Sequence, residues 1–249
     1  MSGRWGATRW APDVSSTCEG DVMFEVPEPH DEWLDAFLTV RPPADAPMSW
    51  FSTFSAVVRD ARQATGRHLD TGEVEKADLA GNWLGTVAYL IFLDQIGDCF
   101  EPDPIPRQPA ENTGAIVRAL TYFEPALSDD DILAIYALRC ALIHDYNLVN
   151  FGKGKQADRL HHRFVLVNSK SMPLVERPPV AWDGQLGSST YRMQTQVNVR
   201  RVGDLGESVL TWVQRVHAER RLRVTLPGGI DELAARFSCS TWLDPAEGE

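Results

Sequence analysis

An arginine, a histidine and a tyrosine lie close together in the run Arg139-Cys140-Ala141-Leu142-Ile143-His144-Asp145-Tyr146. Arg139 continues the i, i+3, i+4, i+7 apolar pattern of the residues before it, so we expect it on a helix face that contacts protein. A guanidinium on such a face needs a partner, a subunit interface or an anionic ligand. Histidine transfers protons near neutral pH, and arginine stabilises charge that develops on phosphoryl oxygens. These residue types support cleavage of RNA without a metal.

The spacing of the three residues raises a geometric question. Arg139 and Tyr146 are seven residues apart, so an α-helix returns them to nearly the same face. His144 lies roughly 140° around the helix from Arg139, and we expect that one straight helix cannot direct both at a single atom. Two solutions remain: the helix distorts near His144, or two copies of the motif meet across a twofold axis, as in a symmetric homodimer.

The pattern Arg139-x4-His144-x-Tyr146 resembles the signature of the HEPN family, helical domains that often act as metal-independent RNases. The resemblance covers residues 76–100 and 128–150. It implies a homodimer in which Arg139 and His144 are catalytic. The 2′-hydroxyl of a ribose attacks the adjacent phosphorus and leaves a 2′,3′-cyclic phosphate and a 5′-hydroxyl.

The chain departs from the usual pattern of active HEPN RNases at one position. These enzymes usually have a polar residue directly after the arginine, and Cys140 stands there instead. Asn147 is our candidate to replace that polar group, and Asp94 is our candidate to line a cleft opposite the motif. We expect neither a metal ion nor a cofactor at the site.

Tyr146 has a separate implication. In HEPN toxins paired with a small nucleotidyltransferase, the tyrosine of a similar motif accepts adenylyl groups that silence the RNase. The resemblance therefore makes Tyr146 a candidate nucleotidylation target, and such a nucleotidyltransferase or another antitoxin a candidate partner. The alternative is that Tyr146 is an interfacial aromatic residue whose hydroxyl is hydrogen-bonded.

The charge of the chain limits its partners. A net charge of −11 argues against a protein that coats nucleic acid nonspecifically, and we expect no DNA partner. A local excess of basic residues over 139–163 can still hold a phosphate backbone. Lys153, Lys155 and Arg159 are therefore candidate RNA contacts, and a solvated loop is the alternative reading.

Other features concern compartment and metals. The longest apolar run, residues 83–93, is about half the ~20 residues that a membrane span needs, and no signal-peptide core precedes it. The 4 cysteines form no C-x-x-C pair, so neither a zinc site nor a disulfide framework is indicated. We expect a cytoplasmic protein with no membrane partner. Capping by Ser128 explains the acidic residues 129–131 better than a metal site does.

Hydrophobic periodicity predicts a mainly α fold: a HEPN-like helical bundle with a small β-hairpin insertion before the last long helix. Residues 1–48 are expected to form an irregular acidic arm, and residues 49–249 the helical domain, with the insertion at about 163–200. The predicted helices cover residues 31–38, 50–65, 76–100, 113–123, 128–150, 204–220 and 230–237, and the predicted strands cover 163–168 and 190–199.

Our leading hypothesis is a HEPN-type endoribonuclease of toxin or defence character. The alternative is a catalytically silent HEPN-like domain for RNA binding, dimerisation or scaffolding; its case rests on Cys140 and on the overall acidity. A third reading is an unrelated helical protein that carries the motif by accident.

Overall fold

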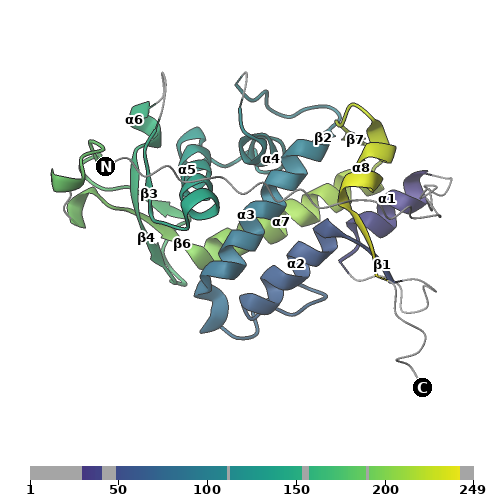
Figure 1. The fold of residues 1–249 in the computed structure, drawn as a ribbon, viewed down its shortest axis with the longest axis horizontal. Coiled ribbons are helices and arrows are strands. Elements are labelled where there is room, and N and C mark those ends of the chain that lie inside the picture. Colours follow the sequence, from purple (N-terminus) through teal and green to yellow (C-terminus); the bar gives the residue numbers. More distant parts are fainter. Residues whose placement is uncertain (1–29, 41–48, 111–112, 153–156, 189–190, 242–249) are drawn as a thin grey trace, which may run out of the picture.

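The computed structural model describes residues 30–40, 49–110, 113–152, 157–188 and 191–241 (Figure 1). Its helices are α1 (His30–Leu38), α2 (Thr53–Ala64), α3 (Trp83–Cys99), α4 (Ala115–Phe123), α5 (Asp129–Asp145), α6 (Ala157–Leu160), α7 (Val199–Ala218) and α8 (Gly229–Phe237). Its strands are β1 (Ser49–Ser52), β2 (Phe100–Pro102), β3 (Val149–Asn150), β4 (His162–Val167), β5 (Val175–Glu176), β6 (Thr195–Asn198), β7 (Leu222–Val224) and β8 (Ser238–Thr241). The prediction of a mainly α fold with a small β portion is confirmed at this level.

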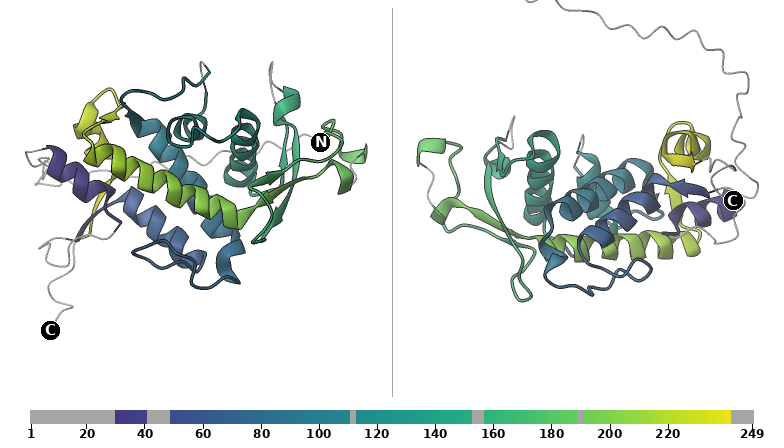
Figure 2. Two further views of the ribbon diagram at one scale, coloured as in Figure 1. Left: turned by 180° about the vertical axis from the view of Figure 1, so that it is seen from behind. Right: turned by 60° about the horizontal axis from the view of Figure 1, so that its bottom comes forward.

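Helix α3 lies at the centre of the helical body and contacts α2, α4, α5 and α7 (Figures 1 and 2). It is apolar on most of its circumference, and its neighbours cover most of it while Leu84 and Ile91 remain exposed. Its fully buried side chains include Tyr89, Leu90, Phe92, Leu93 and Ile96. The site residues of α3 and α5 are therefore supported by a closed core.

The expected irregular N-terminal arm contains a regular element. Within residues 1–48, α1 confirms the helix predicted over residues 31–38, and its Trp33 and Phe37 are buried in the main core. The hydroxyl of Ser52 donates to the carbonyl oxygen of Phe37 at 2.6 Å and ties α1 to the start of α2. Burial of large apolar side chains explains why this short segment is helical.

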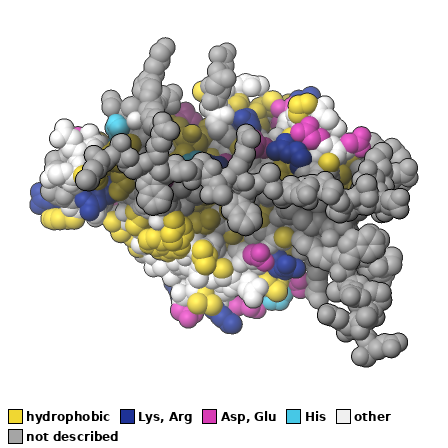
Figure 3. Space-filling view, viewed as in Figure 1, with side chains coloured by type: hydrophobic (Ala, Val, Ile, Leu, Met, Phe, Trp, Pro, Cys, Tyr) yellow, Lys and Arg dark blue, Asp and Glu magenta, His cyan; other side chains and the backbone are white. Residues whose placement is uncertain are grey.

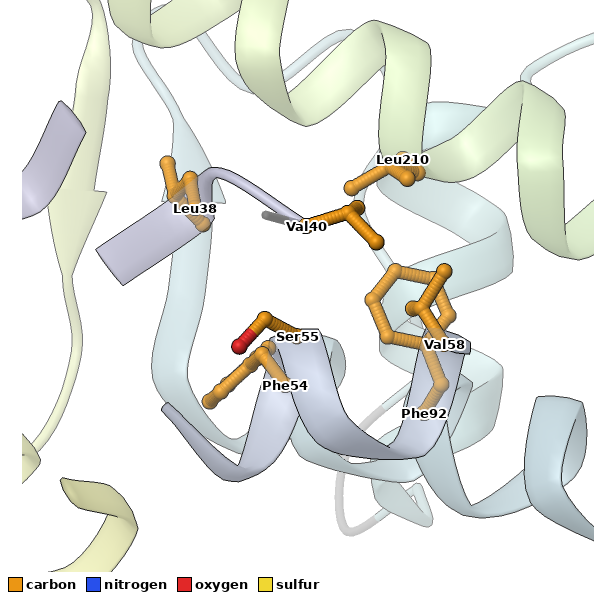
Figure 4. A pocket seen from close by; sticks show the side chains of 7 residues that line it. All are labelled: Leu38, Val40, Phe54, Ser55, Val58, Phe92 and Leu210. Atoms are coloured by element: carbon orange, nitrogen blue, oxygen red, sulfur yellow. The ribbon is translucent and has the colours of Figure 1, made fainter. Parts of the chain in front are cut away.

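Side chains from α1, α2, α3 and α7 meet where α1 ends (Figure 4). The space among them is lined by Leu38, Val40, Phe54, Ser55, Val58, Phe92 and Leu210, and its volume open to water is about 0 Å³. This part of the interior is closely packed, and it holds no room for a ligand.

The small sheet beside α5 has the strand order β3-β4-β6-β5. Strands β4 and β6 are parallel, with Phe164 opposite Thr195, so the predicted β-hairpin is wrong. A hairpin requires a short turn, whereas residues 168–194 form a long connection that includes β5, antiparallel to β6. The sheet also begins earlier than expected, because β3 pairs with β4 directly after the motif helix.

Two pairs of short antiparallel strands, β1–β8 and β2–β7, join segments that are far apart in the sequence. Several helix boundaries also differ from the prediction: α3 begins at Trp83, α5 ends at Asp145, and α7 begins at Val199. No helix in the described part of the chain combines the length and apolarity needed to cross a bilayer.

Candidate functional site

Helix α5 carries the motif and has well-defined ends. The hydroxyl of Ser128 accepts a hydrogen bond from the Asp131 amide at 3.1 Å, which confirms the predicted N-cap. At the other end Tyr146 adopts a left-handed conformation, with φ 47° and ψ 44°. The Tyr146 amide donates to the carbonyl oxygen of Leu142 at 3.1 Å, which is the αL motif of a helix C-terminus, and the Asn147 amide donates to the carbonyl oxygen of Ala141. Arg139 and His144 are thus in the last turns of α5, and Tyr146 lies just beyond them.

Asp94 of α3 is the partner of Arg139. The guanidinium donates from Nε to Asp94 Oδ2, and the two side chains are 23% and 16% exposed. Burial raises the pKa of Asp94, while the hydrogen bond and charge of Arg139 lower it. Sequence analysis offered Asp94 as a residue that lines a cleft opposite the motif or marks where its helix reaches solvent. The structure pairs it with Arg139, and it is not among the residues that line the cleft beside α5.

The position of Asp94 depends on a close approach of α3 and α4. At Gly97, an added β-carbon would lie 1.8 Å from the carbonyl oxygen of Ala115, so only glycine permits this distance. One turn away, Asp94 Oδ1 accepts a hydrogen bond from the Ile116 amide at 3.2 Å. Because Gly114, the N-cap of α4, has no side chain, Asp94 caps this helix from α3. The carboxylate is fixed from two sides.

Arg139 and His144 contact each other within one chain. Arg139 Nη1 lies 2.9 Å from His144 Nε2, and α5 is continuous through both residues. The helix does not distort near His144, and the two side chains touch on one continuous helix, which the sequence analysis did not expect. The physical reason is the length of the arginine side chain, which bends along the helix to a residue on the following turn. A guanidinium only donates hydrogen bonds, so Nε2 accepts and the neutral imidazole has its proton on Nδ1.

A solvent-open cleft of about 540 Å³ lies along the exposed side of α5. One wall comes from α5, and the other from residues 147–152 and α6. The lining residues are Tyr136, Cys140, His144, Asp145, Asn147, Val149, Asn150, Phe151, Gly152 and Leu160. His144 is an exposed residue of this wall, so a bound ligand can reach its imidazole.

Asn147, the candidate for the missing polar group, lines this cleft. Its Oδ1 accepts from the Val149 amide at 2.6 Å, so its Nδ2 is the group that it can offer to a ligand. Cys140 lines the same cleft from α5.

Of the three candidate RNA-contacting residues, only Arg159 lies in the part of the chain that the structure describes. Arg159 donates to Asp130 at 2.6 Å, near the N-terminal end of α5, and this hydrogen bond lowers the pKa of Asp130. Arg159 does not line the cleft, although its side chain is partly exposed. Lys153 and Lys155 lie outside the described residues. The structure thus does not bring Arg159 to the motif.

Tyr146 is 53% exposed, and its ring makes an edge contact with Trp83, with 6.2 Å between the ring centroids. Within the described ranges no residue hydrogen-bonds its hydroxyl. In a single chain the hydroxyl is therefore accessible, which is the property that a modification target needs.

An aromatic cluster beside the cleft was missed by sequence analysis. Phe151 contacts Trp182, with ring centroids 5.4 Å apart, and Trp182 contacts His161. Phe151 and Trp182 come from segments whose proximity depends on the unpredicted sheet order, so no local pattern connects them. The only signal in the sequence is a large apolar residue placed directly before Gly152.

In the part of the chain that the structure describes, no three His, Cys, Asp or Glu side chains gather in a way that could hold a metal ion. His162 is buried against β6: its Nδ1 lies 2.9 Å from Thr195 Oγ1, and its Nε2 lies 3.1 Å from the carbonyl oxygen of Arg159. Its neighbour His161 instead accepts a hydrogen bond from the Gly152 amide.

Comparisons of the chain with protein-family models, with curated proteins and with solved structures found no match. A family assignment therefore depends on the motif and on the geometry around it.

Proposed function

We propose that this protein is a metal-independent endoribonuclease of the HEPN type, with toxin or defence character. The observation that carries the proposal is the 2.9 Å contact between Arg139 Nη1 and His144 Nε2, with His144 in the wall of an open cleft. A fixed cation and a neutral imidazole side by side are the two groups that transesterification of RNA requires.

The contact also suggests how substrate activates the site. In the free protein the Nε2 lone pair of His144 is occupied by the guanidinium of Arg139. A phosphate that binds Nη1 replaces the imidazole as the partner of Arg139 and frees Nε2 to accept a proton. Asp94 holds the guanidinium through Nε during this exchange, so the charge stays in place.

The reaction then follows from proton transfer. The ribose 2′-hydroxyl gives its proton to Nε2 as its oxygen attacks the adjacent phosphorus, and the bond from phosphorus to the 5′-oxygen breaks. The 5′-oxygen takes a proton, which leaves a 2′,3′-cyclic phosphate and a 5′-hydroxyl. Arg139 stabilises the charge on the phosphoryl oxygens. One step needs a base and the other an acid, and His144 residues from two chains would supply both.

A homodimer provides two such histidines, and α3 has a suitable surface. Leu84, Val87, Ala88 and Ile91 follow the i, i+3, i+4, i+7 spacing of one helix face, and Leu84 and Ile91 are exposed. The same face continues to Asp94. Figure 3 shows apolar side chains gathered on the lower left of one face of the molecule. An exposed apolar stripe that leads to the ionic site favours a twofold interface there.

The experiment is cleavage of RNA by the purified protein in excess EDTA, with analysis of the product ends. We expect activity to persist and the 3′ ends to be cyclic phosphates. Loss of activity in EDTA with recovery in magnesium or manganese would contradict the mechanism. Light scattering in the micromolar range tests assembly, and a particle of 27.8 kDa throughout would contradict the composite site.

A specific observation supports the alternative of a silent RNA-binding or scaffolding domain. Cys140 lines the cleft where active HEPN RNases usually have a polar side chain. In that case RNA would bind in the cleft without being cut. Wild type that cleaves none of a broad RNA panel, while still binding RNA, would favour this function.

The accessible hydroxyl of Tyr146 supports a proposal about regulation. A partner nucleotidyltransferase would transfer an adenylyl group from ATP to the Tyr146 oxygen, with release of pyrophosphate. Because Tyr146 follows His144 by two residues, the added nucleotide would stand at the mouth of the site. An increase in mass of one adenylyl group, absent in Tyr146→Phe, is the expected result.

A further inference from the structure

We propose that the cleft beside His144 contains a subsite for one unpaired nucleobase, with Phe151 as its stacking surface. The choice of RNA as ligand rests on the proposed function; the subsite itself rests on the geometry of the cleft wall. Phe151 lines the cleft and is 49% exposed, which is high for a phenylalanine in a concave site. Aromatic rings in this position commonly stack with bases.

The ring of Phe151 packs against a second aromatic residue, Trp182. Trp182 is buried, lies 5.4 Å from Phe151 between ring centroids, and is itself fixed by donation from Nε1 to the carbonyl oxygen of Gln185 at 3.1 Å. The next residue, Gly152, donates its amide hydrogen to His161 Nδ1 at 3.0 Å, and His161 contacts Trp182. Ring and backbone are therefore held in place before a ligand arrives, which lowers the entropic cost of binding.

Two asparagines in the same wall offer complementary polar groups. Asn150 uses Nδ2 to donate to the carbonyl oxygen of Leu160 at 2.8 Å, so its Oδ1 can accept a hydrogen bond from a ligand. Asn147 uses Oδ1 to accept from the Val149 amide, so its Nδ2 can donate. One donor and one acceptor beside an aromatic surface match the edge of a nucleobase.

Charge and size decide which part of a nucleotide occupies the subsite. Asp145 lines the cleft and would repel a phosphate, whereas the cationic Arg139 contacts His144 in the same region. The base is therefore directed to Phe151 and the phosphate to Arg139. A volume of about 540 Å³ suits a small ligand but not a duplex. Bases within a duplex have covered faces, so the ligand must be single-stranded.

The test measures binding without cleavage. Fluorescently labelled RNA with 2′-O-methyl groups lacks the attacking hydroxyl, so it stays intact on the full-length protein. We expect the single strand to bind more tightly than the blunt duplex of the same sequence. Phe151→Ala should weaken single-strand binding about tenfold or more, the usual weight of one stacked base, and Phe151→Tyr should retain it. Tyr191→Ala is the matched control, because Tyr191 is an exposed aromatic residue outside the cleft lining.

The outcomes separate this subsite from the nuclease. Equal binding by wild type and folded Phe151→Ala, or equal binding of duplex and single strand, would overturn the subsite. If Phe151 controls binding while unmodified RNA is never cut, the subsite stands and the ribonuclease proposal fails. If RNA is cut equally well by wild type and Phe151→Ala and both bind alike, the subsite fails and the ribonuclease proposal stands.

Discussion

Two arginines of this protein each join two helices through a carboxylate, and their surroundings differ. Arg62 of α2 donates from Nε and Nη2 to both oxygens of Glu207 in α7, at 2.9 and 2.7 Å. Its Nη1 donates to the carbonyl oxygen of Leu69 at 2.6 Å, and its side chain is 4% exposed. Tyr89 also donates to Glu207, and burial together with that charge raises the pKa of the tyrosine hydroxyl. The donors of Arg62 are used by the protein itself.

Arg139 has a different set of partners. Asp94 accepts a hydrogen bond from the Nε of Arg139, and the Nη1 of Arg139 contacts the exposed imidazole of His144. The Arg139 side chain is 23% exposed. A neutral imidazole is a weaker partner for a guanidinium than a phosphate is, so an anionic ligand can displace it. The comparison separates an arginine that stabilises the fold from one that is anchored by a carboxylate and still available to a ligand.

The largest expected effect is on cleavage. His144→Ala should lower the rate about 10²–10⁴-fold by removing the proton-transfer group, with the fold unchanged because the side chain is exposed. Arg139→Ala should cost at least as much activity, since it removes the charge at the phosphate. Rates on one RNA substrate, with circular dichroism as the control for folding, test both. Equal cleavage by wild type and His144→Ala would remove the catalytic assignment.

For Arg62 the expected loss is in stability. Arg62→Ala leaves Glu207, whose side chain is only 15% exposed, without its ion-pair partner, so the free energy of unfolding should fall by about 3 kcal/mol. The matched control is Arg59→Ala on the same helix, where an exposed pair with Asp60 should contribute less than about 1 kcal/mol. Urea denaturation measures both. If Arg62→Ala lowers the free energy of unfolding no more than Arg59→Ala does, the cluster of Arg62, Glu207 and Tyr89 does not stabilise the fold.

The buried His162 gives a prediction about pH. Burial lowers the pKa of His162 to about 4, from an ordinary value of 6.5, because the charged ring loses its hydration. The unfolded chain therefore takes up this proton first, so the stability from His162 is complete above about pH 6.5 and is lost as the pH falls toward 4. The loss should reach about 3 kcal/mol. We expect His162→Gln to show a flatter curve than wild type over this range, and parallel curves would contradict the assignment.

The smallest expected effect compares the two carboxylates. Asp94→Asn keeps an acceptor oxygen for Arg139, so the free energy of unfolding should fall by about 1 kcal/mol. Glu207→Gln should cost more, because three side-chain hydrogen bonds from Arg62 and Tyr89 meet its carboxylate, whereas Asp94 accepts one side-chain hydrogen bond, from Arg139. Denaturation midpoints at one pH provide the comparison. A larger loss for Asp94→Asn would reverse the distinction between the two sites.

Much of this arrangement could be predicted where the controlling forces are local. Helical periodicity located α5, and Ser128 marked its start. The need of Arg139 for a partner was also evident from its place on an apolar face. That its contact with His144 occurs within one helix was not evident, because backbone angles alone do not describe the reach of a long side chain.

The rest depends on contacts between distant segments. The parallel pairing of β4 and β6 follows from the path of residues 168–194, which no spacing rule encodes. The contact of Phe151 with Trp182 follows from that path in turn. Sequence patterns therefore could not predict the wall of the cleft that lies opposite α5.

The left-handed backbone at residue 146 would be less strained with glycine than with the tyrosine that the chain has there. Glycine ends helices in this conformation at no steric cost, whereas a bulky residue carries roughly 1–2 kcal/mol of strain. Tyr146→Gly would thus relax the main chain and remove the ring that meets Trp83. At the residue where α5 ends and the chain turns toward the cleft, backbone strain is therefore accepted in exchange for an aromatic ring that packs against Trp83.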